Sequence, residues 1–321
     1  MQILSLSSQD SILVTIRCAA YNHGKYIRQT LEGFVMQQTS FRFEALVHDD
    51  ASTDNTAEII REYANKYPDI IKPYFQKENQ FSINPGIIDE WFAANTRGKY
   101  LAICEGDDFW TDPLKLQKQV DFLESHPDYN LVCHNWNTFN GTEYGESPVH
   151  HLYTQPFSFT FAQLPWIWIT KTLTLLLRSS ALDYSLLNQY KYCRDVHFVY
   201  HALKAGKGYY MPEVMATYRV HDGGVWSKHD ANEKNRTTYE LYKELYSFEP
   251  NKAVRKRYMN ATLAYYNGLA FGKETWWHFG TNAKLYYEAL RNITDAKDIV
   301  FCLGGLVPTS LVKWVMKRFK V

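Results

Sequence analysis

The densest acidic group in the chain is the tetrapeptide Glu105-Gly106-Asp107-Asp108. Carboxylates this close repel one another unless a positive charge lies among them. Mg²⁺ and Mn²⁺ take hard oxygen ligands, commonly one or two carboxylates together with phosphate oxygens. The segment therefore predicts a divalent-cation site with Asp107 as a metal ligand and Asp108 beside it. The alternative is an acidic turn before a helix that starts near Pro113.

Two further polar groups follow apolar runs earlier in the chain. Asp49 and Asp50 come after the run 43–48, and Tyr21 and Asn22 come after the run 12–18. A carboxylate can accept the imide N–H of uracil or thymine, and a tyrosine ring can stack on a base. Together with the acidic tetrapeptide, these groups predict a site for a metal-bound nucleotide.

The elements that must position these groups alternate along the first part of the chain. Apolar, β-rich runs predict strands over 12–18, 43–48, 70–75 and 100–104. Helical spacing of apolar residues predicts helices over 27–35, 57–67, 87–95 and 114–125. This alternation predicts parallel βαβ units, in which ligands bind beyond the carboxyl ends of the strands.

The rest of the chain gives weaker signals. We expect a strand from 130 to 134, an irregular region over 137–165, a β-like run over 173–177, a helix over 196–205 and mostly helix over 231–298. The segment 299–321 is apolar with four basic and no acidic residues. It fits a helix lying on an anionic membrane face or one packed on the body of the protein, and both interpretations stay open.

Composition excludes several classes of protein. The net charge of +1 gives no global field for nucleic acid, so no nucleic-acid partner is expected. The five cysteines are widely spaced and odd in number, which favours a reducing compartment over a disulfide framework. Neither a secretory signal nor a membrane-spanning run is recognisable, so we expect a cytoplasmic protein. The segment 299–321 is the candidate for peripheral contact with the inner face of the membrane.

Three segments in order, VTIRCAAYNHGKYIRQTLEGFVMQQ, VHDDASTDNTAEII and GKYLAICEGDDFWTDPLKLQKQ, resemble the family 2 glycosyltransferases with the GT-A fold. The resemblance covers roughly residues 11–125. It implies an α/β, Rossmann-like, mostly parallel sheet flanked by helices. We expect a glycosyltransferase domain over 1–228, with a nucleotide-binding half at 11–125 and an acceptor half at 126–228, and a helical C-terminal region over 229–321.

The resemblance also implies roles for individual residues. Glu105 and Asp107 occupy the positions of an Asp-x-Asp motif, and Glu105 departs from it, so that its contact with metal or ribose stays open. The residues implied to bind the nucleotide are Ala20, Tyr21, Asn22, Asp49, Asp50, Glu105 and Gly106.

In the second half, Asp195 lies before the predicted helix 196–205 and matches the position of the family's general base, although Arg194 replaces an acid that often precedes it. Arg219 and His221 resemble an Arg-x-His element that neutralises the diphosphate, and His221 is an alternative metal ligand. Trp166 and Trp168 fall where the family binds its acceptor.

The resemblance implies an inverting, hexosyltransferase-type enzyme that uses Mn²⁺ or Mg²⁺. Its donor would be a nucleotide-diphosphate sugar, UDP- or dTDP-linked, and its acceptor a glycan or lipid-linked glycan in bacterial cell-surface polysaccharide synthesis. Two alternatives remain open: a metal-dependent sugar-nucleotide phosphohydrolase, and a catalytically silent protein that binds sugar nucleotides.

Overall fold

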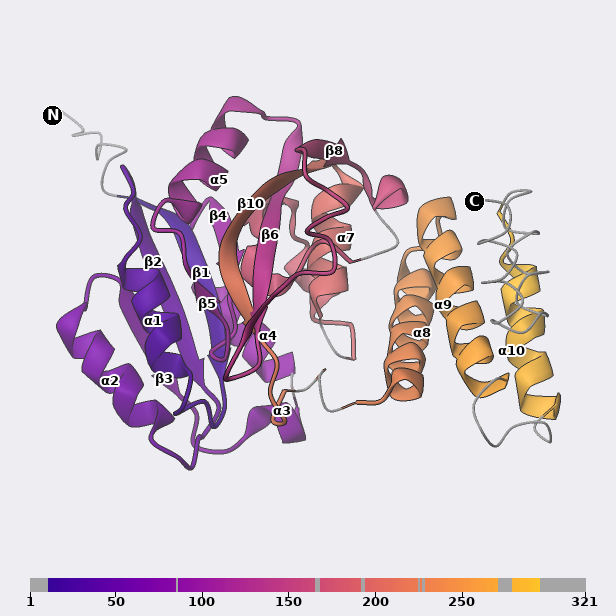
Figure 1. The fold of residues 1–321 in the computed structure, drawn as a ribbon, viewed down its shortest axis with the longest axis horizontal. Coiled ribbons are helices and arrows are strands. Elements are labelled where there is room, and N and C mark those ends of the chain that lie inside the picture. Colours follow the sequence, from indigo (N-terminus) through magenta and orange to yellow (C-terminus); the bar gives the residue numbers. More distant parts are fainter. Residues whose placement is uncertain are drawn as a thin grey trace, which may run out of the picture. The chain divides into compact units, whose positions relative to one another are not determined.

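The computed structural model describes residues 11–84, 86–164, 168–191, 194–224, 226, 229–270 and 279–294. The chain divides into two compact units, Met1–Val220 and His221–Val321. The first unit holds a ten-stranded sheet with helices packed against it (Figure 1). The predicted boundary at 228 stays a prediction.

The strands of the first unit are β1 (Ile12–Ala20), β2 (Arg42–Asp49), β3 (Ile71–Phe75), β4 (Tyr100–Ile103), β5 (Phe109–Trp110), β6 (Tyr129–Phe139), β7 (Tyr144–Glu146), β8 (Phe157–Phe159), β9 (Leu176–Arg178) and β10 (Lys207–Arg219). Its α-helices are α1 (Ile27–Val35), α2 (Thr56–Lys66), α3 (Gln80–Ile83), α4 (Gly86–Asn95), α5 (Lys115–Ser125), α6 (Tyr184–Leu187) and α7 (Asp195–Lys204). Short 3₁₀ turns are η1 (Phe161–Gln163), η2 (Thr172–Thr174) and η3 (Ser179–Ala181).

The order of the strands across the sheet is β3-β2-β1-β4-β9-β6-β10-β5, with β7 beside β6 and β8 beside β10. The first four strands are parallel, as predicted, and β6 and β10 form a second parallel pair. The short strand β9 runs antiparallel to both of its neighbours, β4 and β6. The sheet is therefore mixed, with parallel pairing in each half.

Alternating side chains explain how helices cover both faces of the parallel half. Val14, Ile16 and Cys18 on β1 belong to one buried core with residues of α1, α2 and α5. Leu46 on β2 points to the opposite face, where it packs with Ile88 and Phe92 of α4. This alternation is the period of two that a strand buried on both faces requires.

The second unit contains the helices α8 (Ala231–Phe248), α9 (Lys252–Ala270) and α10 (Phe279–Arg291). Its helical character agrees with the prediction. Among the described residues, no helix combines the length and the apolarity that crossing a membrane would require. The segment 299–321 lies outside the described residues.

Candidate active site

The loops at the carboxyl ends of β1 and β2 are hydrogen-bonded to each other. The Asn22 backbone N–H donates to Ser52 Oγ at 2.9 Å, and Asn22 Oδ1 accepts the Thr53 N–H at 2.8 Å. Asn22 has a positive φ of 54°, which asparagine tolerates better than most residues. Ala20 is buried below this turn, while Tyr21 is 43% exposed beside the strand ends. The Tyr21 ring is thus displayed where a base could stack on it.

Asp49, the last residue of β2, and Asp50, which follows it, are both buried but have different surroundings. The Asp50 carboxylate accepts the backbone N–H groups of Gln80 and Phe81, at 2.8 and 2.9 Å, and so anchors the start of α3. Asp49 Oδ2 accepts the Ser52 N–H at 3.3 Å, whereas Asp49 Oδ1 is buried with no hydrogen-bond partner among the described residues. Burial raises the pKa of Asp49. Of Asp49 and Asp50, Asp49 is therefore the residue with a carboxylate oxygen, Oδ1, that can accept a hydrogen bond from a ligand.

The acidic loop after β4 packs closely on the turn after β1. A Cβ on Gly106 would lie 2.8 Å from His23 Nδ1 and 2.9 Å from Ala20 Cβ, so the position requires glycine. The Thr30 hydroxyl on α1 lies within hydrogen-bonding distance of the carbonyl oxygens of Gly106 and Asp108, at 3.0 and 2.6 Å. The loop conformation is therefore fixed from two sides.

Within this loop, Asp107 and Asp108 are not equivalent. Asp108 is buried and accepts the Arg219 backbone N–H at 2.8 Å; burial and the charge of Asp107 raise its pKa. The Asp107 side chain is 22% exposed, and its Oδ2 lies 3.9 Å from His23 Nε2. Asp107 thus presents the more accessible carboxylate, and Asp108 joins the loop to the end of β10.

Arg219, the last residue of β10, also contacts the acidic loop 105–108. Its guanidinium donates to the Asp107 carbonyl oxygen at 2.6 Å and to Gln29 Oε1, and it lies 4.4 Å from the centre of the Phe109 ring. These contacts bring Arg219 to the acidic loop; its binding of a diphosphate stays a prediction. His221 is the first residue of the second unit, and its role also stays a prediction.

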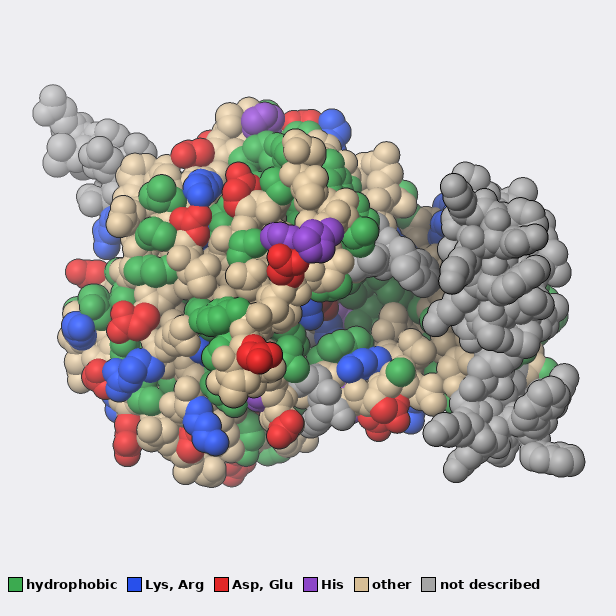
Figure 2. Space-filling model, viewed as in Figure 1, with side chains coloured by type: hydrophobic (Ala, Val, Ile, Leu, Met, Phe, Trp, Pro, Cys, Tyr) green, Lys and Arg blue, Asp and Glu red, His purple; other side chains and the backbone are tan. Residues whose placement is uncertain are grey.

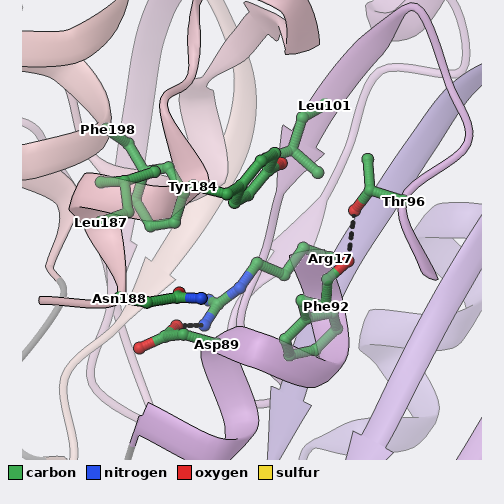
Figure 3. Close-up of a pocket in the computed structure, with 9 residues that line it drawn as sticks. All are labelled: Arg17, Asp89, Phe92, Thr96, Leu101, Tyr184, Leu187, Asn188 and Phe198. Atoms are coloured by element: carbon green, nitrogen blue, oxygen red, sulfur yellow. Dashed lines mark hydrogen bonds and ion pairs between the residues drawn. The ribbon is translucent and has the colours of Figure 1, made fainter. Parts of the chain in front are cut away.

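Glu105, the first carboxylate of the loop, faces Arg17, whose side chain is 11% exposed. Arg17 Nη1 lies 3.6 Å from Glu105 Oε1, and Arg17 Nη2 donates to Asp89 Oδ1 at 2.6 Å. Figure 3 shows the Arg17 guanidinium close to Asp89 and Asn188. The guanidinium carbon lies 4.4 Å from the centre of the Phe92 ring. Arg17 therefore links Glu105 to helix α4, a contact that the sequence did not reveal.

We expect Arg17→Ala to lower the free energy of unfolding by about 3–5 kcal/mol, because Asp89 would remain buried without its cation. Denaturant unfolding followed by circular dichroism measures the change. Arg28→Ala is the control, since the Arg28–Glu62 pair is exposed on the surface and should contribute little. Equal, small losses in the two variants would contradict the structural role given to Arg17.

Asp195 is the first residue of α7, and its carboxylate is held by two donors. Trp168 Nε1–H donates to Asp195 Oδ2 at 2.9 Å, and the Val196 N–H donates to Asp195 Oδ1 at 2.9 Å. Burial raises the pKa of Asp195, while the positive charge of Lys171 lowers it. Trp168 is thus a direct neighbour of Asp195. Trp166 lies outside the described residues.

Two side chains, Lys171 and Tyr218, lie within electrostatic range of both Asp195 and the acidic loop. The Lys171 ammonium lies 4.0 Å from the centre of the Tyr218 ring. The negative charges of Asp108, Asp107 and Asp195 all act on Tyr218 and raise the pKa of its hydroxyl, to which burial contributes most. Sequence reasoning missed Lys171, because a single lysine before a buried run has no distinguishing pattern.

One other group among the described residues has the composition of a metal site: Glu146, His150 and His151. Asn135 argues against it. Asn135 Oδ1 accepts the Trp136 N–H at 2.9 Å, so its amide nitrogen faces His150 Nδ1 at 3.1 Å. The proton of neutral His150 is then on Nε2, which points to Glu146 at 3.5 Å and is not free to bind a metal.

Figure 2 shows acidic and basic side chains interspersed over the visible face, without a large patch of one sign.

Comparison with known proteins finds a family model and individual relatives that match this chain. Residues 15–183 match the family model described as glycosyl transferase family 2. The uncharacterized protein Rv1520 of Mycobacterium tuberculosis is 35% identical over 238 residues, which span 71% of this chain and 64% of that protein. The chain therefore spans less than two thirds of the length of this relative. The putative teichuronic acid biosynthesis glycosyltransferase TuaG of Bacillus subtilis is 25% identical, over 73% of this chain and 88% of TuaG.

Solved structures share the fold at low sequence identity. S. aureus TarS 1–349 in complex with UDP-GlcNAc superposes with a TM-score of 0.64 and 17% identity, covering 88% of this chain and 82% of that one. The mannosyltransferase PcManGT from Pyrobaculum calidifontis, in complex with GDP-Man and Mn²⁺, gives a TM-score of 0.53 and 14% identity, covering 91% and 84%.

Proposed function

Because the chain belongs to glycosyl transferase family 2, we propose that it moves a sugar from a nucleotide-diphosphate donor to an acceptor hydroxyl, with inversion at the anomeric carbon. The observation that carries this proposal is that Asp195 and the acidic loop both lie within electrostatic range of Tyr218, over whose ring the Lys171 ammonium lies. One group can then accept a proton while another, close by, holds the departing diphosphate.

On the donor side, the exposed Tyr21 ring would stack on the base, and Asp49 Oδ1 would accept a base N–H. A pyrimidine imide has such an N–H, which favours UDP- or dTDP-sugars. Asp50 would act indirectly, by holding the start of α3 beside the base. The UDP-GlcNAc complex of TarS, which has the same fold, supports a uridine donor.

Asp107 would hold Mn²⁺ or Mg²⁺. Its partly exposed carboxylate offers the hard oxygen that these ions prefer, and it lies on a loop whose backbone is fixed. When bound, the ion would stabilise the negative charge of the diphosphate. Asp108 would support the site from below, because one of its oxygens already accepts the Arg219 N–H.

Asp195 would act as the general base. As the acceptor oxygen bonds to C1 of the donor sugar, its proton passes to an Asp195 carboxylate oxygen. The bond between C1 and the diphosphate oxygen breaks with its electron pair on the diphosphate. Trp168 would fix the carboxylate orientation through its indole N–H, so that the other lone pairs of Asp195 face the incoming hydroxyl.

The acceptor would be a glycan or lipid-linked glycan of a bacterial surface polysaccharide. The name of TuaG supports a polysaccharide acceptor. Trp168, placed beside Asp195, would border this acceptor, whereas the roles of Trp166 and of membrane contact through 299–321 stay predictions.

We expect UDP- or dTDP-sugars to raise the melting temperature only when Mn²⁺ or Mg²⁺ is present, by several degrees at saturating ligand, because ligand that binds the folded state stabilises it. Differential scanning fluorimetry over UDP-, dTDP- and GDP-sugars with and without metal measures this. Donors that bind are then incubated with candidate acceptors, and the products are analysed by mass spectrometry.

The outcomes separate three functions. Transfer to an added acceptor supports the glycosyltransferase. Release of phosphate without any acceptor would indicate the phosphohydrolase instead. Metal-dependent binding with no turnover on any acceptor would indicate the catalytically silent protein.

A further inference from the structure

Arg17 extends from β1 to helix α4, which fixes the place of its guanidinium. Arg17 Nη2 donates to Asp89 Oδ1 at 2.6 Å, and the guanidinium carbon lies over the Phe92 ring. The side chains of Arg17 and Asp89 are both largely shielded from solvent, so water competes little for this contact. The guanidinium therefore has a defined position in the folded protein.

Backbone hydrogen bonds bring Glu105 beside the same arginine. The Cys104 N–H donates to the Arg17 carbonyl oxygen at 3.0 Å. The Gly106 N–H donates to the Ala19 carbonyl oxygen at 2.9 Å. The residues on both sides of Glu105 are thus bonded to β1, and Arg17 Nη1 lies 3.6 Å from Glu105 Oε1. One guanidinium can serve two carboxylates in this way because both of its terminal nitrogens carry donors.

The length of the Glu105 side chain matters to this contact. Glu105 stands where the Asp-x-Asp motif has its first aspartate, and a glutamate is longer by one carbon–carbon bond, about 1.5 Å. Because the Glu105 carboxylate lies 3.6 Å from Arg17, the carboxylate of an aspartate on the same backbone would fall short of the guanidinium. The departure from the motif and the arginine on β1 are therefore complementary.

Glu105 lies between the parts of the site proposed to bind the base and the metal. Gly106, the next residue, packs on the turn that presents Tyr21, and Asp107 follows it. A nucleoside diphosphate has its ribose between its base and its diphosphate. The Glu105 side chain is 32% exposed, and a carboxylate is a strong acceptor for a hydroxyl. A divalent cation on this carboxylate would be repelled by the guanidinium already paired with it.

We propose that Arg17 is a positioning residue for the donor: it holds the Glu105 carboxylate on the α4 side of the loop, where Glu105 accepts a ribose hydroxyl instead of sharing the cation with Asp107. This inference rests on the proposed function and adds to it a residue to which the family resemblance gave no role. Arg17 acts through Glu105 rather than by contact with the ribose. Its replacement should therefore change which nucleosides bind, and not only the stability of the fold.

The test measures the binding of UDP, 2′-deoxy-UDP and 3′-deoxy-UDP to the full chain with Mn²⁺, by isothermal titration calorimetry. The parent protein should bind at least one deoxy compound roughly 10–100-fold more weakly than UDP, the usual effect of losing a hydrogen bond to a charged group. Arg17→Lys should lose this discrimination, because a lysine ammonium can pair with Asp89 but has no second terminal nitrogen for Glu105. Glu105→Asp should lose it as well, because its carboxylate is too short to reach Arg17.

A purely structural role of Arg17 predicts a different pattern. Arg17→Lys keeps a cation beside Asp89, so an arginine that only neutralised Asp89 could be replaced by lysine with no change in ribose discrimination. Thermal unfolding without ligand shows whether Arg17→Lys is folded. The double variant Arg17→Met with Asp89→Asn removes both charges of the pair together, which avoids an unpaired buried charge. It should also fold and lose the discrimination.

Arg28→Lys is the matched control. Arg28 pairs with Glu62 through both terminal nitrogens, at 2.8 and 2.7 Å, but on the exposed surface. Its replacement should leave the affinities for all three nucleotides unchanged. A general effect of exchanging an arginine for a lysine would appear in this variant too.

The outcomes separate this inference from the proposed function. If Arg17→Lys and the double variant keep the parent discrimination, or if the parent binds all three nucleotides equally, the role of Arg17 is overturned and the proposed function stands. Loss of the Mn²⁺ response in Glu105→Gln would make Glu105 a metal ligand and would also overturn the inference. If the parent binds no nucleoside diphosphate in the presence of metal, the proposed function fails and the role of Arg17 falls with it.

Discussion

Asp195→Asn is expected to lower kcat about 10²–10⁴-fold, the usual contribution of a general base. Asparagine keeps the shape and can still accept the Trp168 indole N–H, which reaches Asp195 Oδ2 at 2.9 Å. It cannot accept a proton from the acceptor hydroxyl. Donor binding should therefore survive, and calorimetric titration of the donor beside a steady-state transfer assay measures the two effects separately.

The pH dependence gives an independent check on the same residue. Burial raises the pKa of Asp195 above that of an ordinary aspartate. A base works in its ionised form, so kcat/KM of the parent enzyme should fall as the pH drops through this raised pKa. Asp183→Asn is the control, because Asp183 is an exposed helix cap whose carboxylate accepts the Ser185 N–H. An Asp195→Asn variant with the parent rate and pH profile would exclude Asp195 as the base.

Asp107→Ala is expected to remove the metal-dependent part of donor binding and to lower kcat/KM about 10²–10³-fold, as the loss of a main electrostatic stabiliser does. The Asp107 carboxylate is the more accessible one in the acidic loop, whereas Asp108 already accepts the Arg219 N–H. Thermal shift with donor and Mn²⁺, compared with donor alone, measures the effect.

The fold should survive this substitution. Asp107 contributes its backbone carbonyl, rather than its carboxylate, to the contact with Arg219, and alanine retains that carbonyl. Asp121→Ala, on the exposed side of α5, is the matched control and should keep the metal response. A full Mn²⁺-dependent shift in Asp107→Ala would place the metal elsewhere.

The structure of residues 11–125 could be predicted from the sequence because its signals are local. Apolar runs such as 43–48 are long enough to mark buried strands, and each is followed at once by the polar residues that the strand positions. The family model over residues 15–183 and the fold shared with TarS confirm the family and the α/β architecture.

The structure of the rest of the first unit was harder to predict, for physical reasons. Strand β10 passes through Pro212, and its register with β6 shifts between Met211 and Val214. A proline within a strand is tolerated at such a bulge, yet in a sequence it indicates an interruption. The region 137–165, predicted as irregular, contains the end of β6 and the strands β7 and β8, which are too short to show alternation.

Some details of the site depend on contacts between distant residues, and no local pattern could reveal them. Asp50 anchors Gln80 and Phe81, thirty residues on, and Arg17 joins Asp89 to Glu105. The Lys171 ammonium lies over the ring of Tyr218, which belongs to the distant strand β10. These pairings exist only once the sheet has assembled.

The three-residue strand β9 has a consequence for how such a protein can diversify. Chain direction reverses from β4 to β9 and again from β9 to β6, so the two reversals cancel. Both parallel groups consequently open toward the same rim, and helix α5 lies in the chain between β4 of the first group and β6 of the second. Insertions and exchanges in the later group can therefore change the loops on its side of the rim without turning the carboxyl ends of β1, β2 and β4 away from them.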